Sequence, residues 1–175
     1  MRRLLLLRHA KAERPQAGGR DHERLLDARG REDAGTVGHY LLRHTLIPEL
    51  VLVSTAARTR QTWELAAAAL DKTPSVVLED RLYNAAAEDI LKVVKEIDPG
   101  VRTILLVGHN PGLHELAASL VASGDLESRQ RLHEEFPTAA LAVIDFPLDA
   151  WEKLHPHSGR LERFVSARSL AAATD

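Results

Sequence analysis

The chain has 175 residues, of which 45% are apolar and 27% are charged, and its formal net charge is −2. These values are typical of a globular protein, and the length predicts a single domain over residues 1–175 with a sizeable core. The balanced charge excludes a generally basic surface of the kind that binds nucleic acid, so any basic site has to be local. The sequence contains no cysteine, which excludes disulfides and thiolate catalysis and suits a reducing cytosol.

The N-terminal segment is similar to a targeting signal only superficially. Two arginines and then four leucines, residues 4–7, follow Met1. The apolar core of a signal peptide needs about 7–15 residues, and a membrane span needs about 20. The sequence therefore predicts a cytoplasmic protein that has neither nucleic acid nor membrane among its partners.

Apolar runs and helical periodicity alternate along the chain. Residues 4–7 predict a buried strand, residues 11–29 a long loop, and Asp27 the N-cap of the next helix. A second cap is predicted at Ser54 or Thr55. Further strands are predicted at residues 51–53, 76–78, 103–107, 139–146 and 161–166. Helices are predicted from apolar spacing over residues 34–42, 63–70, 87–94 and 113–120.

This alternation determines the predicted fold class. Strands that alternate with helices form a mainly parallel sheet with helices on both faces, so we expect a three-layer α/β/α domain. The last two strands have no helical pattern between them. They therefore predict an antiparallel element at the C-terminal end of the domain.

Polar side chains of one chemical type follow three of the predicted strands. Arg8 and His9 follow the first strand, Arg58 lies in the first turn of the helix after the second, and His109 follows the fourth. Open α/β sheets bind ligands at the carboxyl ends of their strands, and helix N-termini favour anions. Two histidines and two or more arginines at this edge predict a pocket for a phosphate-like anion.

Histidine clusters can also bind metal ions, but their spacing here argues against a metal site. His109 and His114 are five residues apart, so they do not share a helix face as ligands four residues apart would. His155 and His157 lie in a predicted surface connection. The sequence also lacks the glycine-rich motifs that bind nucleotides. We therefore expect neither a metal nor an organic cofactor.

These motifs resemble those of the histidine phosphatase superfamily, the phosphoglycerate-mutase-like group. Residues 8–10 are similar to its Arg-His-Gly/Ala signature, and residues 54–62 to its Ser-x-x-x-Arg-x-x-Gln-Thr motif. The Gly-His-Asn-Pro motif is matched by residues 108–111. The second match makes Arg58, rather than Arg60, the arginine that the family would use.

The resemblance extends to the small SixA-type phosphohistidine phosphatases. Residues 21–30 are similar to their Asp-x-x-Arg-Pro-Leu-x-x-x-Gly segment, with Leu25 where that group often has proline. This match implies a substrate-binding role for Arg24. The strand at residues 136–146 is also similar to their late strand, so the resemblance covers residues 4–165.

The family implies a mechanism. His9 would attack phosphorus as a neutral imidazole and become phosphohistidine, which water then hydrolyses. Arg8 and Arg58 would hold the phosphoryl oxygens, and His109, in its protonated form, would donate a further hydrogen bond to them. The resemblance thus implies a phosphatase that needs no metal.

The substrate class depends on the proton donor for the leaving group. Larger members of the superfamily carry a carboxylic acid in an insertion after the second helix, for which this chain has no room. Glu79 and Asp80 are the only obvious acids nearby. Imidazole leaves more easily than an alkoxide, so weak provision of acid favours a phosphohistidine-containing phosphorelay or phosphotransfer protein as the substrate. The alternatives are a small-molecule phosphomonoesterase and a non-catalytic module that binds phosphate or a phosphopeptide.

Overall fold

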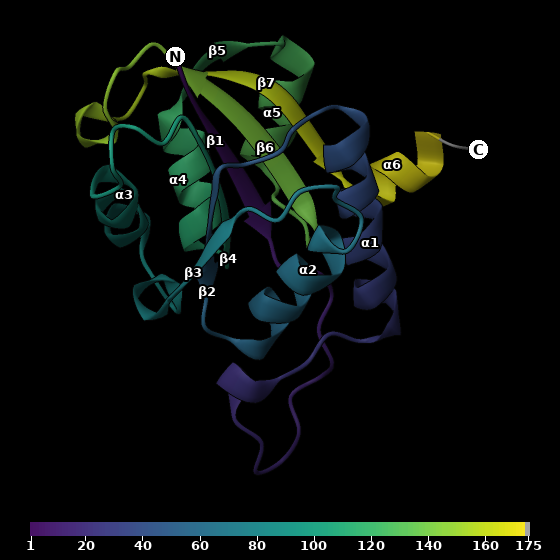
Figure 1. Cartoon of the computed structure of the whole chain (residues 1–175). Coiled ribbons are helices and arrows are strands. Elements are labelled where there is room, and N and C mark those ends of the chain that lie inside the picture. Colours follow the sequence, from purple (N-terminus) through teal and green to yellow (C-terminus); the bar gives the residue numbers. More distant parts are fainter. Residues whose placement is uncertain (174–175) are drawn as a thin grey trace.

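The computed structural model describes residues 1–173, which form a seven-stranded sheet between two layers of helices (Figure 1). The strands are β1 (Arg2–Arg8), β2 (Leu50–Ser54), β3 (Ser75–Glu79), β4 (Thr103–Gly108), β5 (Val121–Gly124), β6 (Ala140–Phe146) and β7 (Gly159–Ser166). The α-helices are α1 (Ala28–Arg43), α2 (Ala57–Ala67), α3 (Ala87–Lys95), α4 (Gly112–Leu120), α5 (Leu126–Glu134) and α6 (Ala167–Ala173). Short 3₁₀ helices are η1 (Asp21–Glu23), η2 (Asp80–Leu82) and η3 (Trp151–Lys153).

The strand order of the sheet is β3-β2-β4-β1-β6-β7-β5. The pairs among β3, β2, β4 and β1 are parallel, as is the pair of β7 with β5. β6 pairs antiparallel with both β1 and β7, so it runs opposite to the other strands. The predicted three-layer α/β fold with an antiparallel C-terminal element is confirmed, and β6 alone supplies the antiparallel strand.

Alternate residues of the central strand face two separate cores. Leu4 and Leu6 pack with side chains of α3, α4 and α5, whereas Leu5 and Leu7 pack with side chains of α1, α2 and α6. All four leucines are fully buried. The continuous apolar run of β1 therefore arises because both faces of this strand are covered.

The segment between β1 and α1 is a long loop that extends below the sheet in Figure 1. An isolated antiparallel bridge between Ala12 and Leu26 closes its base, and η1 lies within it. The Asp27 side chain accepts a hydrogen bond from the Gly30 amide, which confirms the predicted N-cap of α1. The loop is therefore held at both ends and presents η1 at the carboxyl edge of the sheet.

The sequence did not indicate three of the elements. β5 and α5 lie in a region for which we predict none, and α6 follows β7 directly. Leu132 is the only buried residue of α5, and Ala122 and Ser123 of β5 are exposed. Neither element has the apolar periodicity that marks an amphipathic helix or a buried strand.

The described residues include no helix that is both long and apolar enough to cross a bilayer.

Candidate active site

The three motif-bearing strand ends meet at one edge of the sheet. β1 and β4 are neighbouring parallel strands with Arg8 in register with Gly108, and β2 pairs with the other side of β4. The residues that follow β1 and β4 are therefore adjacent, and the ring centroids of His9 and His109 lie 5.3 Å apart. The structure brings together the two histidines that the sequence placed in separate motifs.

His9 is held in one defined orientation. Its side chain is buried, with Nδ1 2.8 Å from the carbonyl oxygen of Ala10. Because a carbonyl oxygen can only accept, Nδ1 carries the proton and Nε2 keeps its lone pair. Burial, together with the charges of Arg8, Arg58 and Arg24, lowers the pKa of His9 to about 4. The ring is therefore neutral at physiological pH and presents a nucleophilic nitrogen.

His109 is neutral as well, which corrects the expectation of a protonated ring. Burial, followed by His9 and the charge of Arg58, lowers its pKa to about 3. Its Nε2 lies 2.8 Å from the hydroxyl of Ser54, which is fully buried, while its Nδ1 is buried without a partner among the described residues. When Ser54 donates to Nε2, Nδ1 bears the hydrogen, so the neutral ring still offers a donor to an anion.

The turn between β2 and α2 is built differently from the predicted cap. Ala56 is the N-cap residue of α2 and makes no side-chain cap, so the expectation of Ser54 or Thr55 was wrong. The Ser54 hydroxyl is engaged with His109, and the Thr55 hydroxyl donates to Asp80. Side chains at this turn therefore link separate segments of the site instead of capping their own helix.

Two further residues of the second motif connect α2 to the loop after β1. The Thr62 hydroxyl accepts a hydrogen bond from the Ala10 amide at 3.0 Å. The side-chain carbonyl of Gln61 accepts one from the Leu26 amide at 2.8 Å. The motif thus ties the helix that carries Arg58 to the backbone on both sides of the loop.

Arg58 lies in a cluster of charged and aromatic groups that the loop completes. It is buried and donates from Nη1 to the main-chain oxygen of Asp21 at 2.9 Å and from Nη2 to its carboxylate at 3.0 Å. The same carboxylate accepts from Arg24 at 2.9 Å and from the Tyr83 hydroxyl at 2.7 Å. The bond from Tyr83, followed by those from the arginines, lowers the pKa of Asp21. Arg60, in contrast, is exposed.

Arg8, the last residue of β1, is held by the segment that precedes β6. Its Nη1 donates to the carbonyl oxygen of Phe136 at 3.1 Å, and Asn110 donates to the same oxygen at 2.8 Å. Burial, followed by the charge of Arg58, lowers the pKa of Arg8. The carbonyl of Phe136 therefore anchors residues from two of the motifs.

The three arginines form an anion-binding environment around His9. The charges of all three lower the pKa of His9. The Nε atoms of Arg8, Arg58 and Arg24 are buried and, among the described residues, have no hydrogen-bond partner. Buried donors that lack a partner are costly, so this arrangement favours an anion with several acceptor oxygens.

The two predicted proton donors lie in different surroundings. Both carboxylate oxygens of Glu79 accept from Arg81, and these bonds lower the pKa of Glu79, so it is ionised. Asp80 is exposed and accepts from Thr55, whose hydroxyl also contacts His22. His22 and Tyr83 also lie in this part of the site, and neither was predicted as a site residue. No motif marks Tyr83, and His22 lies in the segment from which we selected only Arg24.

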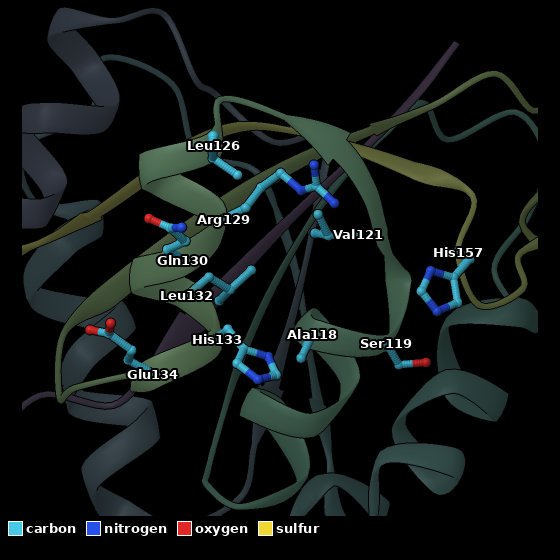
Figure 2. A pocket seen from close by; sticks show the side chains of 10 residues that line it. All are labelled: Ala118, Ser119, Val121, Leu126, Arg129, Gln130, Leu132, His133, Glu134 and His157. Atoms are coloured by element: carbon cyan, nitrogen blue, oxygen red, sulfur yellow. The ribbon is translucent and has the colours of Figure 1, made fainter.

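A separate hollow of about 810 Å³ lies between α4, β5 and α5 (Figure 2). It is near the C-terminal end of α4, whereas the N-terminal end of that helix faces His109. None of the ten side chains in Figure 2 belongs to the motifs of the site.

Within residues 1–173, no cluster of three or more His, Asp or Glu side chains is arranged to hold a metal ion.

Comparisons with known proteins agree with the motifs. A model of the histidine phosphatase superfamily (branch 1) matches residues 4–90. The uncharacterized Mycobacterium tuberculosis protein Rv1276c is 38% identical over 140 residues, which cover 79% of this chain and 85% of that protein.

Solved structures are similar over almost the whole chain. A candidate phosphohistidine phosphatase SixA from Agrobacterium tumefaciens is 31% identical, with a TM-score of 0.79 and coverage of 94% of this chain and 97% of that one. The corresponding SixA protein from Nakamurella multipartitia is 30% identical, with a TM-score of 0.80 and coverage of 94% and 95%. The protein is therefore a phosphatase that belongs to the histidine phosphatase superfamily, in its SixA-type group.

Proposed function

We propose that this protein is a phosphohistidine phosphatase, which removes phosphate from a phosphohistidine-bearing protein through a covalent intermediate on His9. The observation that carries the proposal is the state of His9. Its ring is buried and neutral, its Nδ1 is fixed on the Ala10 carbonyl, and three guanidinium groups act on it. A neutral imidazole with a free Nε2 is a nucleophile, and the surrounding cations suit the anionic group that it attacks.

The proposed reaction has two steps. His9 Nε2 forms a bond to phosphorus while the bond from phosphorus to the leaving group breaks, and the leaving atom takes the electron pair. Water then attacks the phosphorus of the phosphohistidine, and Nε2 regains its lone pair as phosphate forms. Both steps pass through a phosphoryl group whose charge is spread over its oxygens, and this charge is what the pocket has to stabilise.

Four side chains are proposed to hold the phosphoryl oxygens. Arg8, Arg58 and Arg24 supply positive charge and N–H donors, and His109 supplies Nδ1–H from a neutral ring. The combined charge of the three arginines offsets that of the phosphoryl group, so we propose catalysis without a metal ion. The presence of three arginines in one site suits a group that carries the negative charge of a phosphoryl group.

We propose a phosphorelay or phosphotransfer protein of the cytoplasm as the substrate. Two similar structures, at 31% and 30% identity, carry the name of phosphohistidine phosphatases. The short connection between α2 and α3 holds β3 and η2 and leaves no room for a large insertion. We propose that a site without such an insertion leaves room for a histidine on the surface of a protein. The absence of cysteine suits a reducing compartment.

The test is a phosphatase assay with EDTA present, on a phosphohistidine protein, a phosphoserine peptide, a sugar phosphate and para-nitrophenyl phosphate. We expect turnover of the phosphohistidine protein and the aryl phosphate. Rapid quenching at alkaline pH should trap the phosphoryl group on His9, and the His9→Ala variant should be inactive while its circular dichroism spectrum is unchanged. His133→Ala, an exposed histidine on α5, is the matched control.

Other results would support the alternatives. Preferred turnover of the sugar phosphate would indicate a small-molecule phosphomonoesterase. Tight binding of phosphate without release from any substrate would indicate a binding module. Trapped phosphoryl on a residue other than His9, or full activity of His9→Ala, would overturn the assignment of the nucleophile.

A further inference from the structure

A chain of three hydrogen-bonded side chains lies at the edge of the site. His22 comes from η1, Thr55 from the turn between β2 and α2, and Asp80 from η2. The Thr55 hydroxyl donates to Asp80 at 2.7 Å, and His22 Nε2 lies 2.9 Å from the same hydroxyl oxygen. Segments that are far apart in the sequence are thus joined through one threonine.

The direction of this chain fixes where a proton lies. Thr55 has a single hydroxyl hydrogen, which is committed to the carboxylate of Asp80. The hydroxyl oxygen can then only accept, so His22 Nε2 carries a hydrogen and donates it. The chain therefore holds Nε2 of His22 on Thr55 and leaves Nδ1 as the ring nitrogen that can transfer a proton.

His22 lies beside the proposed phosphoryl site, on a different segment from His9. Its ring packs edge-on against Tyr83 with centroids 4.7 Å apart, and Tyr83 packs against His109 at 5.6 Å. The residue before it, Asp21, holds Arg58. The ring is half-buried, so part of it is exposed to solvent. A nucleophile attacks phosphorus from the side opposite the leaving group, so the proton donor has to stand away from His9.

We propose that His22 is the catalytic proton donor to the leaving group, and that Thr55 and Asp80 are its positioning residues. This inference rests on the proposed transfer of the phosphoryl group to His9. Glu79 is less suited to the task because Arg81 occupies both of its oxygens.

His22 gives up one proton in the first step and regains one in the second. In the first, the bond from phosphorus to the leaving atom breaks, and that atom takes the proton from Nδ1 of the His22 imidazolium, which becomes neutral. In the second, water attacks phosphorus, and Nδ1 of His22 takes a proton from the water as the bond to His9 Nε2 breaks. The products are phosphate and the protonated leaving group, and His22 returns to its starting form.

The test compares His22→Gln with the wild-type enzyme on a series of substituted phenyl phosphates, from the para-nitro compound to phenyl phosphate. Glutamine keeps an N–H donor for Thr55 but has no proton to transfer. We expect little change on para-nitrophenyl phosphate, whose leaving group departs unprotonated, and a loss of about 10²-fold or more on phenyl phosphate, as removal of a general acid typically causes. The rate of the variant should therefore depend more steeply on leaving-group basicity.

Thr55→Val and Asp80→Asn should steepen the same dependence to a smaller extent, which a merely structural effect on all substrates would not do. His133→Gln is the matched control and should match the wild-type slope. An unchanged slope in His22→Gln, or an equal loss on every substrate, would overturn the proposal. The aryl series does not require phosphohistidine to be the natural substrate. Failure of the proposed function would appear instead as wild-type turnover of the aryl phosphates without turnover of the phosphohistidine protein.

Discussion

Arg58 donates one hydrogen bond from each of its Nη groups to Asp21, one to the main-chain oxygen and one to the carboxylate. A guanidinium has five N–H donors, so this leaves Nε–H and one hydrogen on each Nη for a substrate. The Tyr83 ring lies 6.0 Å from the guanidinium, and its hydroxyl donates to the same carboxylate. Asp21 therefore fixes the plane and the rotation of the arginine before any phosphate arrives.

Loss of this contact should impair catalysis although Asp21 itself does not touch the phosphoryl group. We expect Asp21→Asn to lower kcat by about tenfold or more, which is less than the 10²–10³-fold typical for removal of a donor. Vanadate, which mimics the transition state, should bind more weakly in parallel. Tyr83→Phe should have a smaller effect of the same kind, because it removes one of the donors to Asp21. Glu23→Gln, an exposed neighbour in η1, is the control and should be silent.

The two arginines at the start of α2 should differ sharply. Arg58 is buried beside Asp21, whereas Arg60 is exposed. We expect Arg58→Ala to lose about 10²-fold or more in kcat/KM and Arg60→Ala to be nearly silent. Steady-state kinetics on para-nitrophenyl phosphate measure both variants. An essential Arg60 would show that the second motif has been matched two residues out of register.

The low pKa values of His9 and His109 can be measured directly. Burial and the neighbouring cations lower them to about 4 and about 3, so their ring signals in NMR should not titrate between pH 7 and pH 5. The nucleophile then stays neutral in mildly acidic solution, and kcat/KM should not fall there through protonation of His9. Assignment comes from the His9→Gln and His109→Gln variants. A midpoint near the usual imidazole value of about 6.5 would contradict this prediction.

The same shifts have a consequence for stability. An unfolded histidine binds its proton near pH 6.5, but the folded chain binds it only near pH 4 at His9. The unfolded state therefore binds more protons between these values, and the free energy of unfolding falls as the pH is lowered through this interval. Urea denaturation at several pH values should show a shallower decline in His9→Gln than in the wild type.

The sequence predicted the elements that have a regular apolar pattern and the site residues that stand at the ends of buried strands. The leucines of β1 have the pattern of a strand that is covered on both faces. Arg8 ends this strand, and His9 and His109 come directly after β1 and β4. The contact between Asp21 and Tyr83 joins residues 62 positions apart, and no local pattern marks it. The caps proposed at Ser54 and Thr55 failed because these hydroxyls bind His109 and Asp80, a tertiary preference that overrides local capping.

Two glycines on α1 should respond to alanine in opposite directions. A Cβ at Gly38 would overlap the carbonyl oxygen of Ala66, because α1 and α2 pack closely at this point, whereas a Cβ at Gly35 would meet no atom within 4 Å. We expect Gly38→Ala to lower the free energy of unfolding by about 1–3 kcal/mol through overpacking. Gly35→Ala should raise it by about 0.5–1 kcal/mol, because alanine loses less conformational entropy in a helix. Urea denaturation measures both variants, and equal effects would show that helix propensity, rather than the contact with Ala66, decides the outcome.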